Sequence, residues 1–254
     1  MVPYFSNTER IEIALGTANA RFAHPPQKPF SDLRRGVQIL DQIEDFYDFK
    51  NHIVHPELHP ILDSGIERRL KPLLEDFLRM GWIRQISSGK YERQDSDAFS
   101  YIKGSWLEEY VWHVAKLAGM TEAVFNQEIV WSEPGVVDYA KNEIDLIACN
   151  GERFLLMSCK TMDPTPSGQA LTGKTRDLSD NAKEVAYWID HFFPDSGVGT
   201  LVATLDMVDE QNRVDRYPVA EVRALKQNIE ILGVEDLSPK RLVEYFKDSR
   251  HWTC

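Results

Sequence analysis

This chain of 254 residues has no long apolar run, few cysteines and no excess of basic residues. No segment approaches the roughly 18 consecutive apolar residues that a membrane-spanning helix requires, so a transmembrane protein is excluded. The first residues have neither a basic flank nor an apolar core, so no secretory signal is expected. The three cysteines, Cys149, Cys159 and Cys254, form no CxxC pair, which excludes a disulfide framework and a zinc knuckle. A reducing, cytoplasmic location is therefore expected.

Basic residues are scarce: 29 lysines and arginines stand against 40 aspartates and glutamates, for a net charge of −11. Residues 1–103 hold 14 basic and 15 acidic side chains, and residues 104–254 hold 15 and 25. Because the acidic excess lies in the second part, we predict two units that join near Gly104. Proteins that hold duplex nucleic acid by bulk charge carry a basic face, so this balance argues against that mode of binding.

The first unit, residues 1–103, is expected to be mainly helical. The predicted elements are helices over residues 31–50 and 63–80, a strand over residues 82–86 and a return strand over residues 90–93. Ser31 is the expected N-cap of the first helix, and Gly81 the end of the second. This order is the outline of a winged-helix-like module, and a helix and hairpin packed on a neighbouring unit explain it equally well.

The second unit, residues 104–254, alternates helices with strands. The predicted helices cover residues 106–118, 180–193, 219–226 and 238–246, and the predicted strands residues 124–131, 142–149, 153–161, 200–205 and 228–232. Residues 163–179 are rich in proline and glycine and are expected to form a loop. Asn150-Gly151 is a strong hairpin signal between two of the strands. We therefore predict an α/β fold with a mixed sheet flanked by helices.

The hairpin carries the residues with the clearest chemistry. Asp145 lies in mid-strand, where a carboxylate is costly unless it is paired or binds a cation. Lys160 ends the apolar return strand, where its ammonium can stabilise developing negative charge. A preceding helix adds Glu108 and Glu109, which flank its apolar stripe symmetrically. This set is typical of a metal-dependent phosphodiesterase, in which carboxylates hold Mg²⁺ or Mn²⁺. A surface hairpin with an Asp–Lys ion pair is the simpler alternative.

Three ordered blocks resemble a known family: Gly104-Ser105-Trp106-Leu107-Glu108-Glu109-Tyr110, Asn142-Glu143-Ile144-Asp145 and Ser158-Cys159-Lys160-Thr161. They resemble the effector half of the CARF-linked nucleases of type III CRISPR systems, over roughly residues 75–245. Those proteins carry a restriction-endonuclease-like PD-(D/E)XK core behind a cyclic-oligoadenylate sensor domain. The resemblance implies metal-dependent cleavage of DNA or RNA, usually by a homodimer. It assigns metal binding to Asp145, the catalytic lysine to Lys160 and the helix glutamate to Glu108.

The sequence departs from that family in two ways. Ser158 occupies the position of the second acidic ligand, so the metal is held by Asp145, Glu108, the Cys159 carbonyl and water, or Glu143 assists, or activity is weakened. The first hundred residues are too short and too poor in strand pattern for a sensor domain. Control by a cyclic oligoadenylate activator is therefore not supported by the residues present.

Other candidate residues carry weaker signals. Lys174 and Arg176 lie at and just after a Gly-Lys-Thr triplet whose glycine spacing does not fit a phosphate loop, and they are candidates for contact with a nucleic-acid backbone. The Cys159 thiol is expected to be buried and structural rather than a nucleophile. Four aromatic residues could stack on bases, but packing in the core or an interface is favoured for most of them: Trp82, Tyr91, Tyr101 and Trp106.

Three histidines, His52, His55 and His59, lie close together in the sequence. Pro56 and Pro60 interrupt the spacing that a helical metal site needs, so a solvated loop is favoured over a metal centre.

Three functions are compatible with these patterns. The first is a metal-dependent nuclease of the PD-(D/E)XK type, acting in antiviral defence or a mobile element. The second is a catalytically weak protein of the same fold that binds nucleic acid or a protein partner, which Ser158 favours. The third is a winged-helix DNA-binding protein, and the near-neutral first unit without a basic recognition helix argues against it.

Overall fold

The computed structural model describes residues 8–132, 135, 139–162, 170–209, 214–215, 229–248 and 250. For residues 170–175, 208–209 and 214–215 it describes the backbone alone. The helix expected over residues 219–226 lies outside the described residues. Among those described, no helix is long and apolar enough to cross a membrane.

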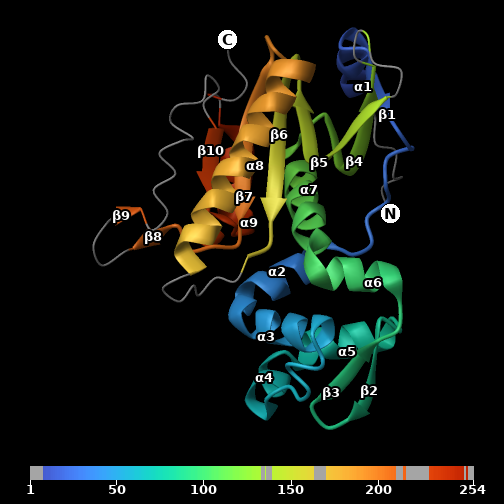
Figure 1. Cartoon of the computed structure of the whole chain (residues 1–254), viewed down its shortest axis with the longest axis vertical. Helices are drawn as coiled ribbons and strands as arrows, with labels where there is room; N and C mark the ends of the chain where they lie inside the picture. The colour runs from blue at the N-terminus through green and yellow to red at the C-terminus, as the bar shows by residue number, and fades with distance from the viewer. Residues whose placement is uncertain are drawn as a thin grey trace.

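A six-stranded mixed sheet forms the centre of the molecule (Figure 1). Its strands, in spatial order, are β1 (Ala20–Phe22), β4 (Glu122–Trp131), β5 (Ala140–Asn150), β6 (Arg153–Lys160), β7 (Gly197–Ala203) and β10 (Ile229–Leu232). The first four pair antiparallel, and β6, β7 and β10 pair parallel. The mixed α/β sheet predicted from the sequence is therefore confirmed.

Helices cover both faces of the sheet. One face packs against α7 (Trp106–Ala118) and α9 (Pro239–Lys247), the other against α1 (Glu9–Thr17) and α8 (Ala170–Phe192). Leu146 and Ala148 of β5 point into the first core, and Ile147 and Cys149 into the second. Because both faces are buried, the middle of the hairpin reads as a continuous apolar run rather than an alternating one.

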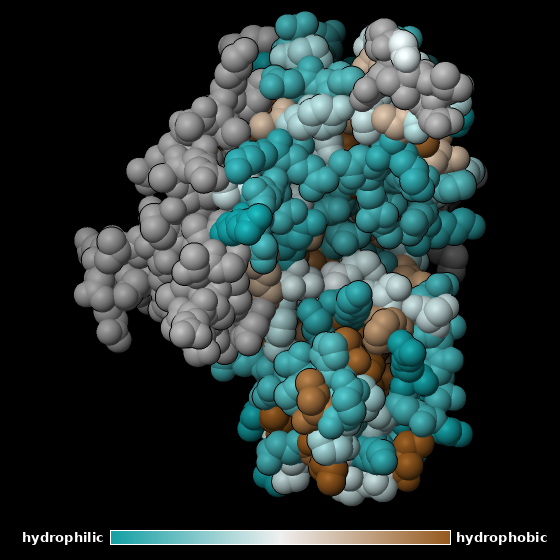
Figure 2. All heavy atoms as spheres, viewed as in Figure 1, coloured by the Kyte–Doolittle hydropathy of each residue, from teal (hydrophilic) through white to brown (hydrophobic). Residues whose placement is uncertain are grey.

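The helical part lies below the sheet in Figure 1. It contains α2 (Leu33–Asp41), α3 (Ile43–Val54), α4 (Ser64–Arg69), α5 (Lys71–Arg79), the hairpin of β2 (Ile83–Ser87) and β3 (Lys90–Arg93), and α6 (Ser96–Ser100). The hairpin is placed as predicted. Figure 2 shows apolar side chains gathering on the surface of this part, whose exposed apolar residues include Leu58, Ile61 and Ile86.

Two long helices predicted from the sequence are each broken. The expected 63–80 helix divides at Leu70, because Pro72 lies in the first turn of α5 and its ring does not fit the middle of a helix. The expected 31–50 helix divides at Gln42, and Asp32 rather than Ser31 is its N-cap, accepting a hydrogen bond from Arg35 N. The loop expected over residues 163–179 is also wrong in part, because α8 begins at Ala170.

The boundary near Gly104 does not separate two hydrophobic cores. One cluster of buried side chains runs from Ile39 through Trp106 to Phe246, and the rings of Phe46 and Trp106 meet edge to face at 5.9 Å. In addition, α1 and β1 pack with the sheet, although they precede the helical part in the sequence. The two parts are therefore packed into one body.

His52 is a buried structural residue of α3 rather than part of a solvated loop. Its Nδ1 lies 2.6 Å from the His59 carbonyl oxygen, and its Nε2 accepts a hydrogen bond from Tyr91 N at 2.9 Å. Through these two contacts the ring joins α3 to the following loop and to the β2–β3 hairpin.

Candidate active site

The candidate site lies where β5 and β6 separate. Along most of its length β5 pairs with β4, but it pairs with β6 only from Leu146 to Asn150. Beyond Leu146 and Met157 the two strands part, and β6 continues beside β7 as far as Lys160. This fork in the sheet brings Asp145 of β5 next to Ser158, Cys159 and Lys160 of β6.

Asp145 is the centre of the fork, with a side chain only 8% exposed. Its Oδ2 accepts hydrogen bonds from Cys159 N at 2.6 Å and from Ser158 Oγ at 3.2 Å, and it lies 3.7 Å from Lys160 Nζ. Burial raises the pKa of Asp145, and the lysine and the two hydrogen bonds oppose that shift without cancelling it. The carboxylate is thus fixed in place while its charge is incompletely compensated.

Glu108 projects from the first turn of α7 toward the same group. Burial and the negative charges of Asp145 and Glu143 raise the pKa of Glu108 to about 8, against the opposing effect of Lys160. Among the described residues, Glu108 Oε2 is buried without a hydrogen-bond partner. A buried carboxylate oxygen without a partner is costly, and either a proton, which the raised pKa favours near neutral pH, or a bound cation relieves the cost.

Glu109, the other candidate on this helix, lies away from the fork. It accepts hydrogen bonds from Phe30 N at 2.6 Å and from Ser31 N and Oγ at 2.5 Å. Burial alone would raise the pKa of Glu109, but hydrogen bonds from His113, Ser31 and Phe30 outweigh it and hold that pKa below its usual 4.5. The structure therefore gives the adjacent glutamates different surroundings: Glu108 faces Asp145, and Glu109 anchors the segment at residues 30–31.

Replacing this anchor tests its role in stability. We expect Glu109→Gln to lower the free energy of unfolding by about 1–3 kcal/mol at neutral pH, because the buried N–H donors lose a charged acceptor. The contribution of a carboxylate with a lowered folded pKa is complete above pH 4.5 and is lost as pH falls through that lowered value. Urea unfolding at pH 7 and at about pH 3.5 should therefore show a smaller difference from wild type at the lower pH.

The exposed carboxylate of Glu75 on α5 provides the matched control. Glu75→Gln should change the free energy of unfolding by less than about 0.5 kcal/mol at either pH. Equal stability of Glu109→Gln and wild type at pH 7 would contradict the structural role of Glu109.

The donor set for a divalent cation is small. Among the described residues, no three His, Cys, Asp or Glu side chains converge as a metal centre. The charge of Asp145 raises the pKa of Glu108, which indicates that the two carboxyl groups lie close together. The Cys159 carbonyl belongs to the end of β6, next to Lys160. Oxygen donors of this kind suit Mg²⁺ or Mn²⁺, which complete their coordination with water and substrate.

Other residues predicted from the sequence lie elsewhere. Arg176 is exposed on α8 and pairs with Asp180 at 3.7 Å, and the Lys174 side chain lies outside the described residues. The four aromatic residues considered for stacking on bases are all buried in the core: Trp82, Tyr91, Tyr101 and Trp106. The Cys159 thiol is buried, and burial raises its pKa well above the usual value, as expected for a structural cysteine.

Two neighbours of the fork were not assigned from the sequence. Glu184 of α8 raises the pKa of Asp145 and accepts a hydrogen bond from Asn142 at 2.9 Å. Asn126 lies in β4 between Phe125 and Gln127, whose partners Leu146 and Ile144 flank Asp145. Its φ of 48° is left-handed, which asparagine tolerates better than most residues but which no local sequence pattern announces.

Comparison with known proteins rests on structure alone. Neither a known protein-family profile nor a curated protein matches this sequence. Protein VC1899 from Vibrio cholerae has a similar structure, with a TM-score of 0.61 and 15% identity, over 93% of this chain and 61% of that one. Can2 from Sulfobacillus thermosulfidooxidans, solved in complex with cyclic tetra-adenylate, is similar with a TM-score of 0.55 and 15% identity, over 93% and 60%. The chain thus spans about 60% of each structure that it matches, and the likeness shows the fold.

Proposed function

We propose that this chain is a metal-dependent nuclease that hydrolyses phosphodiester bonds of DNA or RNA at the fork between β5 and β6. The observation that carries the proposal is the meeting there of the buried carboxylate of Asp145, the half-buried carboxylate of Glu108 and one lysine. Glu108 has an unpartnered oxygen among the described residues, Asp145 is held by Ser158 and Cys159, and Lys160 lies 3.7 Å from Asp145. Carboxylates and a lysine at a sheet end suit phosphodiester hydrolysis assisted by a metal ion.

Each residue at the fork has a separate role in the proposed hydrolysis. Asp145, Glu108 and the Cys159 carbonyl would hold Mg²⁺ or Mn²⁺, which supplies Lewis-acid polarisation of the phosphate and activation of water. Lys160 has 32% of its side chain exposed and holds its ammonium 3.7 Å from Asp145, where it would stabilise the charge that develops on the phosphate. The Ser158 hydroxyl fixes the orientation of Asp145.

The comparisons support a biological setting for this activity. Can2 binds cyclic tetra-adenylate, and the matched part of Can2 is 60% of its chain. Together with the three motif blocks around Glu108, Asp145 and Lys160, this likeness supports a role in CRISPR-linked antiviral defence or in a mobile element. We further propose that the chain acts in the cytoplasm as a homodimer, as the resembled nucleases usually do.

A second function is favoured by one observation. Ser158 stands where the resembled nucleases carry an acidic ligand, and its fully buried hydroxyl donates a hydrogen bond to Asp145. A catalytically weak protein that binds nucleic acid or a protein partner would retain this arrangement.

A cleavage assay separates the two functions. Labelled single- and double-stranded DNA and RNA are incubated with the protein in Mg²⁺, in Mn²⁺ and in EDTA. We expect cleavage of at least one substrate with a metal ion and none in EDTA, and saturable heat when Mn²⁺ is titrated into the protein by calorimetry. Cleavage that persists in EDTA, or the absence of both cleavage and Mn²⁺ binding, would contradict the nuclease proposal. Absence of both cleavage and saturable Mn²⁺ heat, with retained binding of a labelled strand, would support the weak binding protein.

A further inference from the structure

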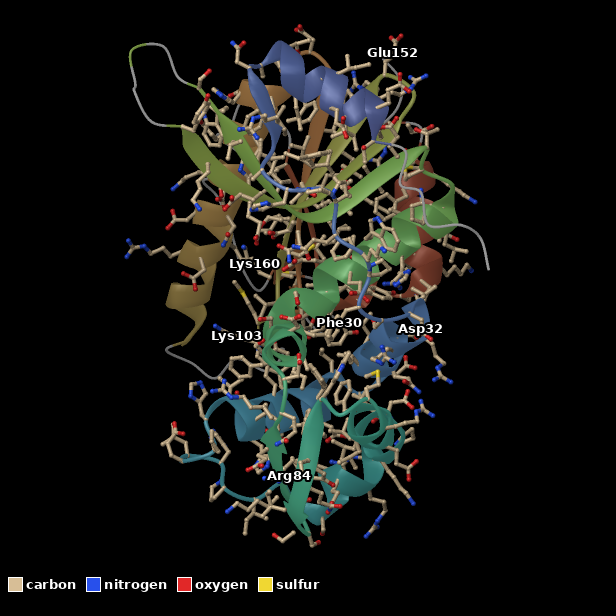
Figure 3. All side chains as sticks on the ribbon, turned by 90° about the vertical axis from the view of Figure 1, so that its right-hand side faces the viewer. Phe30, Asp32, Arg84, Lys103, Glu152 and Lys160 are labelled. Carbon is tan, nitrogen blue, oxygen red and sulfur yellow. The ribbon has the colours of Figure 1, made fainter. Side chains whose placement is uncertain are left out.

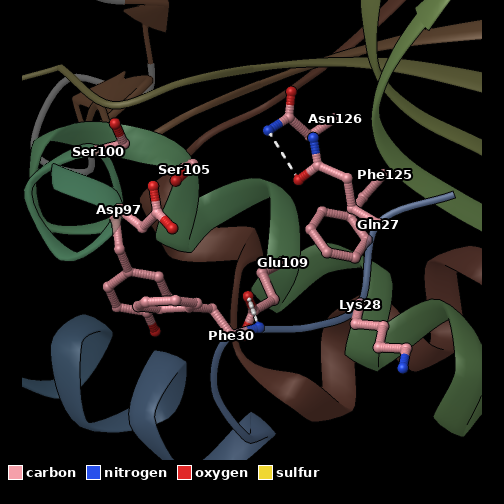
Figure 4. Close-up of a pocket in the computed structure, with 10 residues that line it drawn as sticks. Gln27, Lys28, Phe30, Asp97, Ser100, Ser105, Glu109, Phe125 and Asn126 are labelled. Atoms are coloured by element: carbon pink, nitrogen blue, oxygen red, sulfur yellow. Dashed lines mark hydrogen bonds between the residues drawn. The ribbon is translucent and has the colours of Figure 1, made fainter. Parts of the chain in front are cut away.

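A pocket of about 510 Å³ is lined by Glu109 of α7 and Asn126 of β4 and does not include the fork residues Asp145 and Lys160 (Figure 4). Three segments form its walls: the loop with Gln27 and Phe30, the helical turns with Asp97, Ser100 and Ser105, and β4 at Asn126. Its volume is within the range of small-ligand sites, and its walls combine hydroxyl, amide and carboxylate groups with aromatic rings.

Two unusual backbone conformations meet at this pocket. Residues Tyr101–Ser105 form a π-helical turn between α6 and α7, and Asn126 has a left-handed φ of 48° within a strand. Both conformations are uncommon, both cost conformational free energy, and both occur preferentially at functional sites. Both segments line the pocket, the turn through Tyr101 and Ser105 and the strand through Asn126.

Asn126 connects the pocket to the fork. With its amide nitrogen turned toward Glu143, it donates to the two carboxylate oxygens at 2.8 and 3.2 Å. In the other orientation of the amide, drawn in Figure 4, the same nitrogen instead donates to Gln27 Oε1 on the pocket side at 3.4 Å, so the two sets of hydrogen bonds are alternatives. Glu143 precedes Asp145 by two residues on β5, and the neighbours of Asn126 in β4 pair with the residues on either side of Asp145, so Asn126 lies between the pocket wall and the strand that carries Asp145.

The chemistry of the walls selects the kind of ligand. The charged residues of the walls are of both signs: Asp97 and Glu109 are acidic and Lys28 is basic, and both carboxylate oxygens of Glu109 already accept hydrogen bonds from Phe30 and Ser31. Phe30 is 42% exposed and stacks on Trp82 with a ring-centre distance of 4.7 Å, so it offers an accessible aromatic surface on a rigid support. The amides and hydroxyls supply donors and acceptors. A flat, uncharged group with polar edges fits such walls, and a nucleobase has these properties.

We propose that this pocket binds one unstacked nucleobase of a single-stranded substrate, next to the phosphodiester bond cut at the fork. The proposal rests on the proposed nuclease function and adds a subsite that determines where a strand is cut. A base in the pocket places the adjoining phosphate at Asp145 and Lys160, because Asn126 borders both places.

Substrates with a single missing base test the subsite. Single-stranded oligonucleotides with one preferred cleavage position are made with an abasic residue at each position around the cut. For the wild type, we expect one abasic position to reduce kcat/KM by about 10-fold or more, the range that stacking of one base supports. A reduction below about threefold at every position would overturn the proposal.

Two variants locate the effect in the pocket. Ser100→Trp fills the space from the exposed end of α6, and Phe30→Leu removes the aromatic surface while keeping apolar contact with Trp82. In both, an intact base and the abasic residue should be cut at similar rates, with KM for the intact strand raised. Ser88→Trp, at the exposed turn of the β2–β3 hairpin, is the matched control and should keep the wild-type response. A full abasic effect in both pocket variants would overturn the proposal.

A binding measurement separates failure of the subsite from failure of the nuclease function. If the wild type cuts no substrate, the nuclease proposal fails, and AMP, CMP, GMP and UMP are titrated into wild type and Ser100→Trp by calorimetry. Binding of a mononucleotide that Ser100→Trp weakens by about 10-fold or more would support the pocket. Equal binding to both proteins, or no binding to the wild type, would overturn it.

Discussion

Asp145→Asn should reduce metal-dependent cleavage by about 10³-fold or more, measured as kcat on the best substrate from the assay above. The substitution preserves the shape of the side chain, and its remaining oxygen still accepts the hydrogen bond from Cys159 N. The substitution removes the negative charge of Asp145, which acts on Glu108 and which would help to bind a cation at the fork. Groups that act only on the charge developed in the transition state are worth about two to three powers of ten, and loss of a metal adds to this.

Glu152 provides the control for this experiment. It is an exposed carboxylate on the same hairpin, at the β5–β6 turn and far from Lys160 (Figure 3). Glu152→Gln should cleave at about the wild-type rate, and both variants should have near-native circular dichroism. Undiminished cleavage by a folded Asp145→Asn variant would show that the active site is not at the fork.

Trp106→Ala is expected to have the largest effect on stability, about 3–5 kcal/mol in the free energy of unfolding. Trp106 is fully buried where the helical part meets the sheet part, against Phe46 on one side and its own helix on the other. For a chain of this size, the loss corresponds to a decrease in Tm of about 6–20 °C. Thermal unfolding followed by circular dichroism checks it.

The same helix supplies a control for the tryptophan. Leu117 is 59% exposed on α7, and Leu117→Ala should lower Tm by less than about 2 °C. Because one core spans both parts, wild type and Trp106→Ala should each show a single transition by circular dichroism and by fluorescence. Two separated transitions would show that the parts unfold independently.

The hairpin and its chemistry were predictable because their signals are local. Asn150-Gly151 specifies the turn, and the period of two along each strand fixes which residues share a face. The order of the predicted helices and strands was then enough to predict a mixed sheet flanked by helices. From this, Asp145 and Lys160 were expected close together, and the structure places Lys160 Nζ 3.7 Å from Asp145.

The remaining features depend on tertiary contacts that a single sequence does not display. Helical geometry left Glu108 and Glu109 equivalent, and the choice of Glu108 came from the family resemblance; the hydrogen bonds of Glu109 to Phe30 and Ser31, which separate their surroundings, had no sequence signal. The pairing of β1 with β4 joins residues about a hundred positions apart. Asn126 adopts its backbone conformation because of the strands around it, so its place between fork and pocket had no sequence signal.

The connection between strands also has a consequence for the order in which the chain assembles. Glu108, Asp145 and Lys160 all lie in one stretch formed by α7 and the antiparallel strands β4, β5 and β6, which are joined in sequence order. The parallel strands β7 and β10 follow only after the crossover through α8. Contacts that are near in sequence form faster than distant ones, since less loop entropy is lost in closing them. We therefore expect the three site residues to come together early in folding, before the parallel half of the sheet is added.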